Sequence, residues 1–218
     1  MSHLDSFMYK LKHRFPLLYR FLEMLGAGFT VLKYRKKIIQ VTRENRVVGK
    51  IQGLRAEIRM IGVNDSFKFL QMIAGIPKEH LKFFSPHGMD EHSIRRVLSR
   101  MDILTYGLFV EDQMKAYALL KLFPTGKAYI GRLVLPELTG WGIGKFLSRY
   151  LYWQAYLLKF QPCSTIHDDN IASLHSHQSV RPFCVVGRLP GNFNLIEFKI
   201  SEEDKSSPEL LIGEEMLR

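Results

Sequence analysis

The chain has 218 residues, of which 46% are hydrophobic and 24% are charged. This balance excludes a wholly disordered, collagen-like or coiled-coil protein and is typical of one globular domain with an extension. The net charge is +10, but the first 50 residues hold eleven basic and three acidic side chains and therefore carry +8 of it. The basic character belongs to the N-terminal quarter, and this argues against nucleic acid as a partner of the whole protein.

Two further features concern the compartment. Cys163 and Cys184 are the only cysteines, which excludes a disulfide framework and fits a reducing environment. The longest apolar stretch, residues 15–32, is interrupted by Arg20 and Glu23, so we expect neither a membrane span nor a secretory signal. The sequence predicts a cytoplasmic protein, with peripheral contact to an anionic membrane as an open alternative.

The N-terminal residues have a helical pattern. Apolar residues recur at steps of three and four over residues 5–25, which predicts an amphipathic helix that Pro16 kinks or splits, or a second helix with Pro16 in its first turn. We expect residues 26–28, Gly-Ala-Gly, to end it and residues 29–42 to form a strand or hairpin arm. Such a basic segment can bind nucleic-acid phosphates, lie on anionic lipid, or pack on the neighbouring domain with its basic face in solvent.

From residue 54 onward the pattern changes to alternating strands and helices. The predicted strands cover residues 56–63, 105–110, 114–123, 127–135, 164–167, 184–187 and 194–200. The predicted helices cover residues 66–73, 90–101, 145–160 and 170–178, and residues 77–89 form a loop. Two connections of three residues join the middle strands as antiparallel hairpins. We therefore predict an α/β fold of the mixed α+β kind, with a mostly antiparallel central sheet flanked by helices. Residues 1–53 are the N-terminal extension of amphipathic helices plus a strand, residues 54–200 the main domain, and residues 201–218 a polar tail.

One motif carries most of the chemical information. Residues 133–145 read LVLPELTGWGIGK, an apolar strand followed by a glycine-rich turn and a helix. Gly140, Gly142 and Gly144 allow backbone amides to converge on an anion at the helix N-terminus, and a diphosphate fits such a site. A Walker loop needs glycine at position 139 and a dinucleotide fingerprint needs glycine at position 147, but these are Thr and Leu. A close-packed turn without a ligand is the other interpretation.

The turn resembles the Gln/Arg-x-x-Gly-x-Gly/Ala pattern of the GNAT superfamily of acyl-CoA-dependent N-acyltransferases, with Thr139 at the first position. The resemblance covers about residues 56–200. It implies that backbone groups of Leu133 and Leu135 hold the pantetheine arm and that amides of residues 139–145 hold the pyrophosphate. The residues implied in contact with CoA are Leu133, Val134, Leu135, Thr139, Gly140, Trp141, Gly142, Ile143, Gly144, Lys145, Asn170 and Ser173.

A second segment, residues 170–177, is similar to the superfamily pattern Asn-x-x-Ser-Leu-x-x-His/Tyr. The resemblance implies that Asn170 and Ser173 contact the CoA arm and that His177 protonates the departing thiolate as the catalytic acid. A packing or surface histidine is the alternative. The sequence departs from the pattern at Arg181-Pro182-Phe183, where relatives have Gly-Phe one residue earlier.

The acceptor side of the reaction is less defined. No carboxylate lies in residues 129–132, where many relatives have a base. The remaining candidates for a base are His87, Glu111, Asp112, His167 and Asp168, or positioning alone drives transfer. His87 is also a candidate acceptor-site residue, because it lies between two helices that form that site in the superfamily; a loop histidine that caps the next helix is the alternative. Arg132 either binds an acidic group of the acceptor or forms a salt bridge on the sheet.

These interpretations combine into a transferase hypothesis. We expect an N-acyltransferase that moves an acetyl or other acyl group from acyl-CoA, with acetyl-CoA as cosubstrate, to a primary amine of a small molecule such as an amino sugar. A CoA-binding relative without turnover, or a protein that associates with a membrane or nucleic acid through its N-terminus, is the alternative. A homodimer is an open alternative for its assembly. No metal is expected, because no Cys-x-x-Cys pair exists and His175 and His177 would occupy opposed helical faces.

Overall fold

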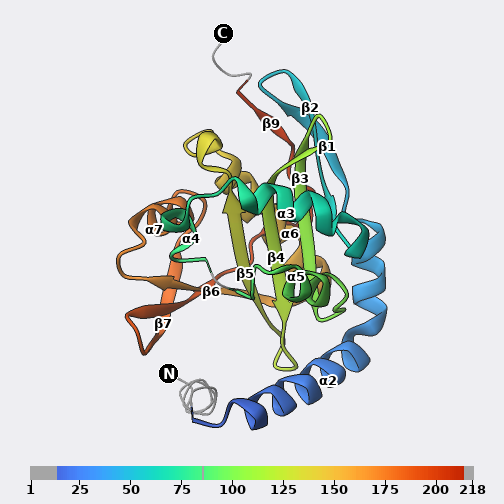
Figure 1. The fold of residues 1–218 in the computed structure, drawn as a ribbon, viewed down its shortest axis with the longest axis vertical. Coiled ribbons are helices and arrows are strands. Elements are labelled where there is room, and N and C mark those ends of the chain that lie inside the picture. The colour runs from blue at the N-terminus through green and yellow to red at the C-terminus, as the bar shows by residue number, and fades with distance from the viewer. Residues whose placement is uncertain (1–13, 85, 214–218) are drawn as a thin grey trace.

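A single large sheet organises the protein. The computed structural model describes residues 14–84 and 86–213. Its strands lie in the order β7-β8-β6-β5-β4-β3-β2-β1-β9, and all neighbours are antiparallel except β5–β6 and β1–β9 (Figure 1). The strands are β1 (Val47–Ile51), β2 (Leu54–Met60), β3 (Ile103–Val110), β4 (Gln113–Leu122), β5 (Lys127–Val134), β6 (Gln161–His167), β7 (Phe183–Leu189), β8 (Phe193–Phe198) and β9 (Leu211–Ile212). The predicted fold class, a mostly antiparallel sheet flanked by helices, is confirmed.

Helices cover both faces of the sheet (Figure 1). The helices are α2 (Pro16–Arg43), α3 (Ser66–Ala74), α4 (Lys78–Leu81), α5 (Glu91–Leu98), α6 (Ile143–Leu158) and α7 (Ile171–Gln178). The apolar side of α6 and the C-terminal half of α2 share one buried cluster, and α3 and α5 pack in the other. Because both faces are covered, every residue of the central strand β3 is buried.

The N-terminal helix differs from its predicted form. Residues 16–43 form one continuous helix, so the expected helix end at residues 26–28 and the expected strand at residues 29–42 are wrong. Tyr34, Ile38 and Val41, at helical spacing, pack on the core, and Ile38 and Val41 are fully buried. Two glycines inside a helix cost about 1 kcal/mol each, which this burial offsets. Pro16 occupies the first turn, where proline is tolerated, and the expected helix over residues 5–13 lies outside the described residues.

The C-terminal segment pairs with β1 at one edge of the sheet. The expected boundary between residues 53 and 54 falls in the tight turn between the paired strands β1 and β2. Residues that were expected as a polar tail form a short 3-10 helix (Glu202–Lys205) and β9, which pairs with β1. Gly49 makes this pairing possible, because a Cβ atom there would lie 1.9 Å from the Leu210 carbonyl oxygen. The C-terminal segment is thus part of the fold.

Candidate active site

The strands β5 and β6 separate to form a wedge. They pair at only three positions, of which Tyr129 with Cys163 is the last, although β5 continues to Val134 and β6 to His167. Beyond that point lies a cavity of about 1490 Å³ that is lined by both separated strands, the glycine turn, α4 and the start of α7. We call the space between residues 130–134 and 164–167 the wedge.

Hydrogen bonding shows which backbone groups of β5 face the wedge. The Leu135 amide donates to the Lys115 carbonyl of the preceding strand segment at 3.1 Å, so odd-numbered residues are directed toward β4. The Ser164 hydroxyl donates to the Ile130 carbonyl at 3.2 Å, so even-numbered residues are directed toward β6. This alternation follows from the two-residue period of a strand.

The backbone groups of Arg132 and Val134 therefore face the wedge. The predicted roles of the Leu133 and Leu135 backbone need correction, because the ladder with β4 uses their hydrogen-bonding groups. Both leucine side chains are buried in the cluster under α3 and α5. Sequence spacing could not distinguish the two registers, since the phase of a strand is set by its partner.

The glycine turn presents a row of amides at the start of α6. Gly140 and Gly142 have φ angles of 91° and 89°, the left-handed region that favours glycine. The first amide bonded within the helix is that of Phe146, which donates to the Gly142 carbonyl at 3.0 Å. Among the described residues, no backbone carbonyl accepts from the amides of Gly140, Gly142, Ile143, Gly144 and Lys145. Such a row fits an anionic group such as a diphosphate.

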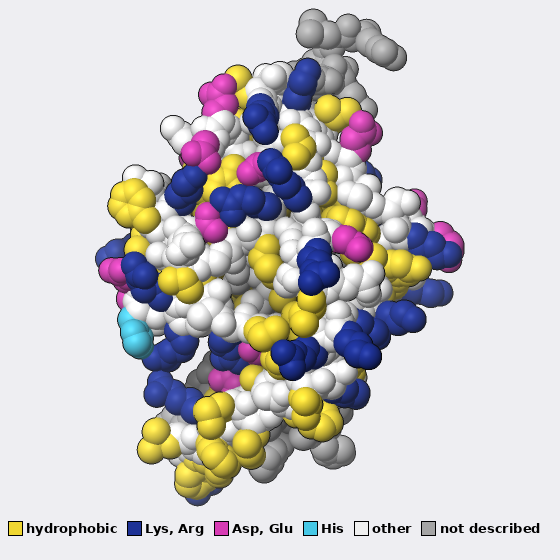
Figure 2. Space-filling view, turned by 90° about the vertical axis from the view of Figure 1, so that its right-hand side faces the viewer, with side chains coloured by type: hydrophobic (Ala, Val, Ile, Leu, Met, Phe, Trp, Pro, Cys, Tyr) yellow, Lys and Arg dark blue, Asp and Glu magenta, His cyan; other side chains and the backbone are white. Residues whose placement is uncertain are grey.

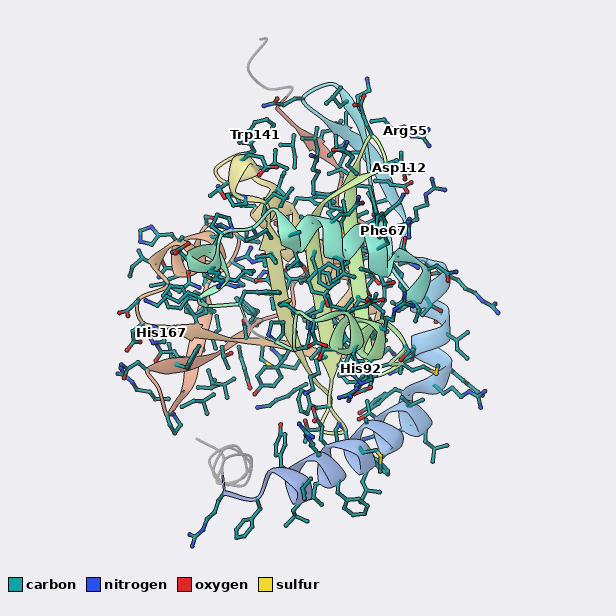
Figure 3. The ribbon with its side chains drawn as sticks, in the orientation of Figure 1. Arg55, Phe67, His92, Asp112, Trp141 and His167 are labelled. Carbon is teal, nitrogen blue, oxygen red and sulfur yellow. The ribbon has the colours of Figure 1, made fainter. Side chains whose placement is uncertain are left out.

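The other predicted residues of the turn have structural roles as well. The Thr139 amide donates to the Pro136 carbonyl at 3.1 Å and the Trp141 amide to the Leu138 carbonyl at 3.4 Å, so both are used within the turn. The Ile143 side chain is buried in the core. The Trp141 side chain is 38% exposed at the rim of the cavity, and Figure 3 shows it in the turn that precedes α6.

Comparisons with known proteins agree with this geometry. The GNAT domain of PAT from S. lividans is 13% identical and covers 71% of this chain and 97% of its own, with a TM-score of 0.63. The PaiA N-acetyltransferase from Thermoplasma acidophilum, solved with coenzyme A, is 18% identical and covers 66% and 98%, with a TM-score of 0.57. The ribosomal-protein-S5-alanine acetyltransferase from Vibrio fischeri is 13% identical and covers 73% and 100%, with a TM-score of 0.59. The fold is that of the GNAT acetyltransferases.

This similarity is one of structure. No protein-family model matches the sequence, and no curated protein matches it. The N-terminal helix α2 contributes to the cavity: its residues Tyr19, Leu22, Glu23, Gly26 and Ala27 line the end that lies at the β4–β5 turn. Glu23 and Lys121 form an ion pair there at 2.5 Å.

Arg132 lines the cavity and does not form the salt bridge that was one of its two predicted roles; its contact with an acceptor stays a prediction. Its side chain donates hydrogen bonds to the Gly144 carbonyl and the Ser148 hydroxyl of α6. No carboxylate in the described part of the chain pairs with it. Burial lowers the pKa of Arg132 to about 10, so it remains a cation at neutral pH. The residue is therefore a fixed positive charge in the wall of the wedge, beside the first turn of α6.

His177 is packed inside the protein. Its side chain is 2% exposed, its ring centre lies 4.9 Å from that of Phe198, and its Nδ1 atom has no hydrogen-bond partner in the structure. Burial, together with the nearby charge of Arg132, lowers the pKa of His177 to about 2. A proton donor must carry a proton at the working pH. His177 lines the cavity, but a ring held neutral at neutral pH argues against its predicted role as catalytic acid.

Asn170 and Ser173 line the cavity, and their contact with the CoA arm stays a prediction. The Asn170 side-chain oxygen caps α7 by accepting from the Ser173 amide at 3.1 Å. This cap fixes the orientation of the Asn170 side chain and leaves its NH₂ group and the Ser173 hydroxyl as the groups that can contact a ligand. Gly144 permits the close approach of α7 to α6, since a Cβ atom there would lie 3.3 Å from the Ser176 hydroxyl.

His87 lies outside the cavity lining. Its Nδ1 donates to the Gly88 carbonyl at 2.8 Å, and the Tyr117 hydroxyl donates to its Nε2 at 3.0 Å. Burial lowers the pKa of His87, so its ring is neutral at neutral pH. The loop packs this ring against Phe69 of α3, and this is the physical reason why it does not reach the acceptor side of the cavity.

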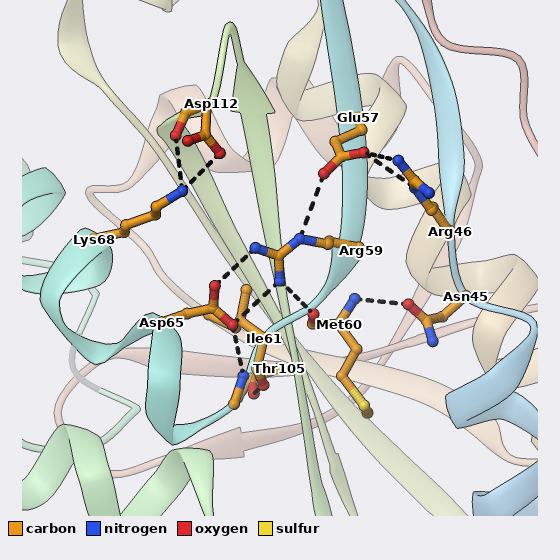
Figure 4. Close-up of polar contacts among 11 residues, drawn as sticks. Asn45, Arg46, Glu57, Arg59, Met60, Ile61, Asp65, Lys68, Thr105 and Asp112 are labelled. Carbon is orange, nitrogen blue, oxygen red and sulfur yellow. Dashed lines mark hydrogen bonds and ion pairs between the residues drawn. The ribbon is translucent and has the colours of Figure 1, made fainter.

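The other predicted bases also lie outside the lining. Asp112 is in the β3–β4 turn, at the opposite end of β4 from the β4–β5 turn, and binds Lys68 at 2.6 Å (Figure 4), and Glu111 precedes it. Asp168 binds Arg188 and Asn194. The fourth candidate, the His167 ring, lies against two phenylalanine rings, at centre distances of 5.2 and 5.0 Å.

Glu79 and His80 of α4 line the cavity. These two titratable residues were not identified from the sequence. The His80 Nε2 atom donates to the Val134 carbonyl at 3.1 Å, at the strand whose backbone faces the wedge. Pro77 was the sequence feature that could have indicated α4, because proline is common at the start of a helix, but α4 has only four residues. Among the described residues, no three His, Cys, Asp or Glu side chains form a metal-ligand group.

Proposed function

We propose that the protein is an N-acyltransferase that transfers an acetyl or similar acyl group from acyl-CoA to a primary amine. The observation that carries this proposal is the continuous line of backbone groups along the cavity. The backbone groups of Arg132 and Val134 face the wedge, and the glycine turn presents five amides at the end of that strand. An extended thioester with an amide-containing arm and a diphosphate matches this order of groups.

The residues present fit acyl-CoA at both ends. The pyrophosphate would bind the amides that precede Phe146, where the positive end of the α6 dipole adds to the attraction. Arg132 contributes a second positive charge near that turn. The amide of Val134 is the donor that would stabilise the oxyanion formed when an amine attacks the thioester carbonyl.

His80 is the side chain that we assign as general base. Its Nε2–H is bonded to the Val134 carbonyl, so the ring is held beside the strand that would carry the thioester. In this tautomer Nδ1 has its lone pair available and accepts the proton that the attacking amine loses. The carbon–sulfur bond then breaks, and the CoA thiolate takes a proton from solvent. A small-molecule amine such as an amino sugar fits the acceptor side, where Phe83, Phe84 and Phe193 present apolar ring faces.

The first test measures release of CoA thiol from acetyl-CoA with a panel of amines that includes hexosamines, polyamines and peptides. The variant His80→Gln should lower kcat by about 10²-fold or more, because general-base catalysis contributes on that scale, and should leave the Kd of CoA unchanged. The loss should shrink at high pH, where more of the amine is already deprotonated.

The matched control is His92→Gln. His92 is exposed on α5, away from the cavity lining (Figure 3), so this variant should keep wild-type kcat. An unchanged kcat in His80→Gln would remove His80 from the mechanism. Tight CoA binding with no turnover on any amine would favour a CoA-binding protein without catalysis.

A further inference from the structure

The outer face of α2 carries an apolar stripe that packs on nothing described. Leu18, Phe21, Leu25, Phe29 and Leu32 recur at steps of three and four, which places them along one side of the helix. All are exposed, and Leu32 is 76% exposed. The flanking residues Leu17 and Met24 are also exposed. Soluble proteins rarely leave such a continuous apolar surface in water without a function for it.

The packing of α2 does not require this stripe. The opposite side of the helix provides the internal contacts: Thr30, Ile38 and Val41 are buried, and Glu23 binds Lys121. Tyr19 and Ala27 line the cavity on the same inner side. The helix therefore has two apolar faces, one used by the protein and one directed outward.

Basic side chains continue the outer stripe at its ends. Arg14 lies two residues before the start of the helix, and Lys36 lies one turn after Leu32, with Arg35 beside it; all three are exposed. Glu23 is the only acidic residue in the helix, and its ion pair turns it inward. Figure 2 shows hydrophobic and basic side chains together over the lower end of the molecule, where α2 lies. The outer surface thus combines apolar area with positive charge.

We propose that the outer face of α2 docks on an anionic membrane surface. A helix that lies in the interface inserts apolar side chains below the headgroups while cations on its polar rim contact anionic lipids. The stripe and its cations supply both parts of this interaction. No helix of the described chain is long and apolar enough to cross a membrane.

The experiment is flotation of the full-length protein with lipid vesicles. One set contains phosphatidylcholine alone and the other contains phosphatidylcholine with phosphatidylglycerol. Binding to the anionic vesicles should be about tenfold tighter or more, and raising the salt from ~0.1 M to ~0.5 M should weaken it. Equal partition of the wild-type protein into both sets would overturn the proposal.

Two pairs of variants separate docking from folding. Phe29→Gln should lower vesicle binding several-fold, whereas Phe67→Gln, at a 67% exposed site on α3, should not. Arg35→Glu should weaken binding to anionic vesicles, whereas Arg55→Glu on β2, at the opposite end of the molecule in Figure 3, should not. If Phe29→Gln binds vesicles as the wild type does, the stripe is not the docking surface.

A second copy of the chain is the alternative occupant. If the protein forms a dimer that Phe29→Gln abolishes, and the wild type ignores both vesicle sets, the stripe is a dimer interface and membrane docking is wrong. The Kd of CoA, measured on every variant, should stay at the wild-type value, so that failure of docking is distinguishable from failure of the proposed catalytic function.

Discussion

Burial changes the chemistry of His177 more than that of any neighbouring residue on α7. Its ring packs on Phe198 and faces the charge of Arg132, and its pKa falls to about 2. Between pH 2 and 6.5 an unfolded chain therefore binds a proton that the native chain excludes. The native state loses stability as the pH falls through this window, and the full contribution is present above pH 6.5.

This linkage gives a prediction for acid stability. On lowering the pH from 7 to 5, the wild-type free energy of unfolding should fall by about 2 kcal/mol more than that of His177→Gln. His175→Gln, which changes an exposed histidine two residues away, should keep the wild-type pH dependence. Urea unfolding followed by circular dichroism at both pH values measures the difference. Equal pH dependence in the wild type and His177→Gln would show that His177 is not held neutral by burial.

At the scale of single residues, sequence reasoning identified the glycine turn, because glycine suits the left-handed φ angles of Gly140 and Gly142 and the close approach at Gly144, but it assigned the wrong backbone phase to β5. The ligand role of the turn stays a prediction. Side-chain roles were harder. His177 has the spacing of a catalytic residue, but its surroundings depend on Phe198 and Arg132, which come from two distant strands. His80 was missed because four helical residues leave no periodic signal.

At the scale of elements, the turn before α6 is the part on which the proposed CoA binding depends. Gly142 is the N-cap of that helix with φ of 89°, and no atom lies within 4 Å of the place that a Cβ would occupy. An alanine there is strained in its backbone, by about 1–2 kcal/mol, without a steric clash. The strain would be relieved by reorienting the amides that should bind the pyrophosphate.

We predict that Gly142→Ala raises the Kd of CoA about tenfold while it lowers the free energy of unfolding by about 1 kcal/mol. The matched control is Gly53→Ala in the β1–β2 turn, where φ is 78° and a Cβ also meets nothing within 4 Å. It should cost similar stability and leave the Kd unchanged. Calorimetric titration and thermal unfolding measure the two quantities. Equal Kd values in both variants would exclude the turn as the phosphate site.

Helix α2 shows where secondary structure could not be predicted from local sequence patterns. The hairpins of the central sheet were predicted well, because short connections and a two-residue period are local signals. In α2, apolar residues lie on both faces, so the sequence lacks the single apolar stripe that is typical of a surface helix. Gly26 and Gly28 resemble the glycines that end a helix, although the helix continues through them. Packing of Ile38 and Val41 on the core stabilises the helical form of residues 29–42, and the local sequence does not show that long-range contact.

At the scale of the whole molecule, one buried ion pair joins the end of α7 to the C-terminal segment. Arg181 binds both carboxylate oxygens of Asp204, at 2.5 and 2.8 Å, and also contacts the Lys199 carbonyl and the Ser201 hydroxyl. Burial alone would lower the pKa of Arg181, but the bonds to Asp204 outweigh it and the pKa is raised. The departure from the superfamily pattern at Arg181 thus has a structural reason.

Breaking this pair should destabilise the fold strongly. Asp204→Asn should lower the free energy of unfolding by about 3–5 kcal/mol, because it leaves a buried guanidinium without its counter-charge. Glu202→Gln removes an exposed partner of Lys205 in the same 3-10 helix and should change the free energy of unfolding far less than Asp204→Asn does. Urea unfolding at pH 7 measures both. Similar losses in the two variants would mean that burial of the pair adds nothing.

Calorimetric titration of the full-length protein with CoA tests the proposed acyl-CoA site most directly. The line of wedge and turn amides predicts one site per chain with a Kd in the micromolar range or tighter, equivalent to about −8 kcal/mol, that weakens in Gly142→Ala but not in Gly53→Ala. Absence of binding by CoA and acetyl-CoA at concentrations up to ~1 mM would contradict it.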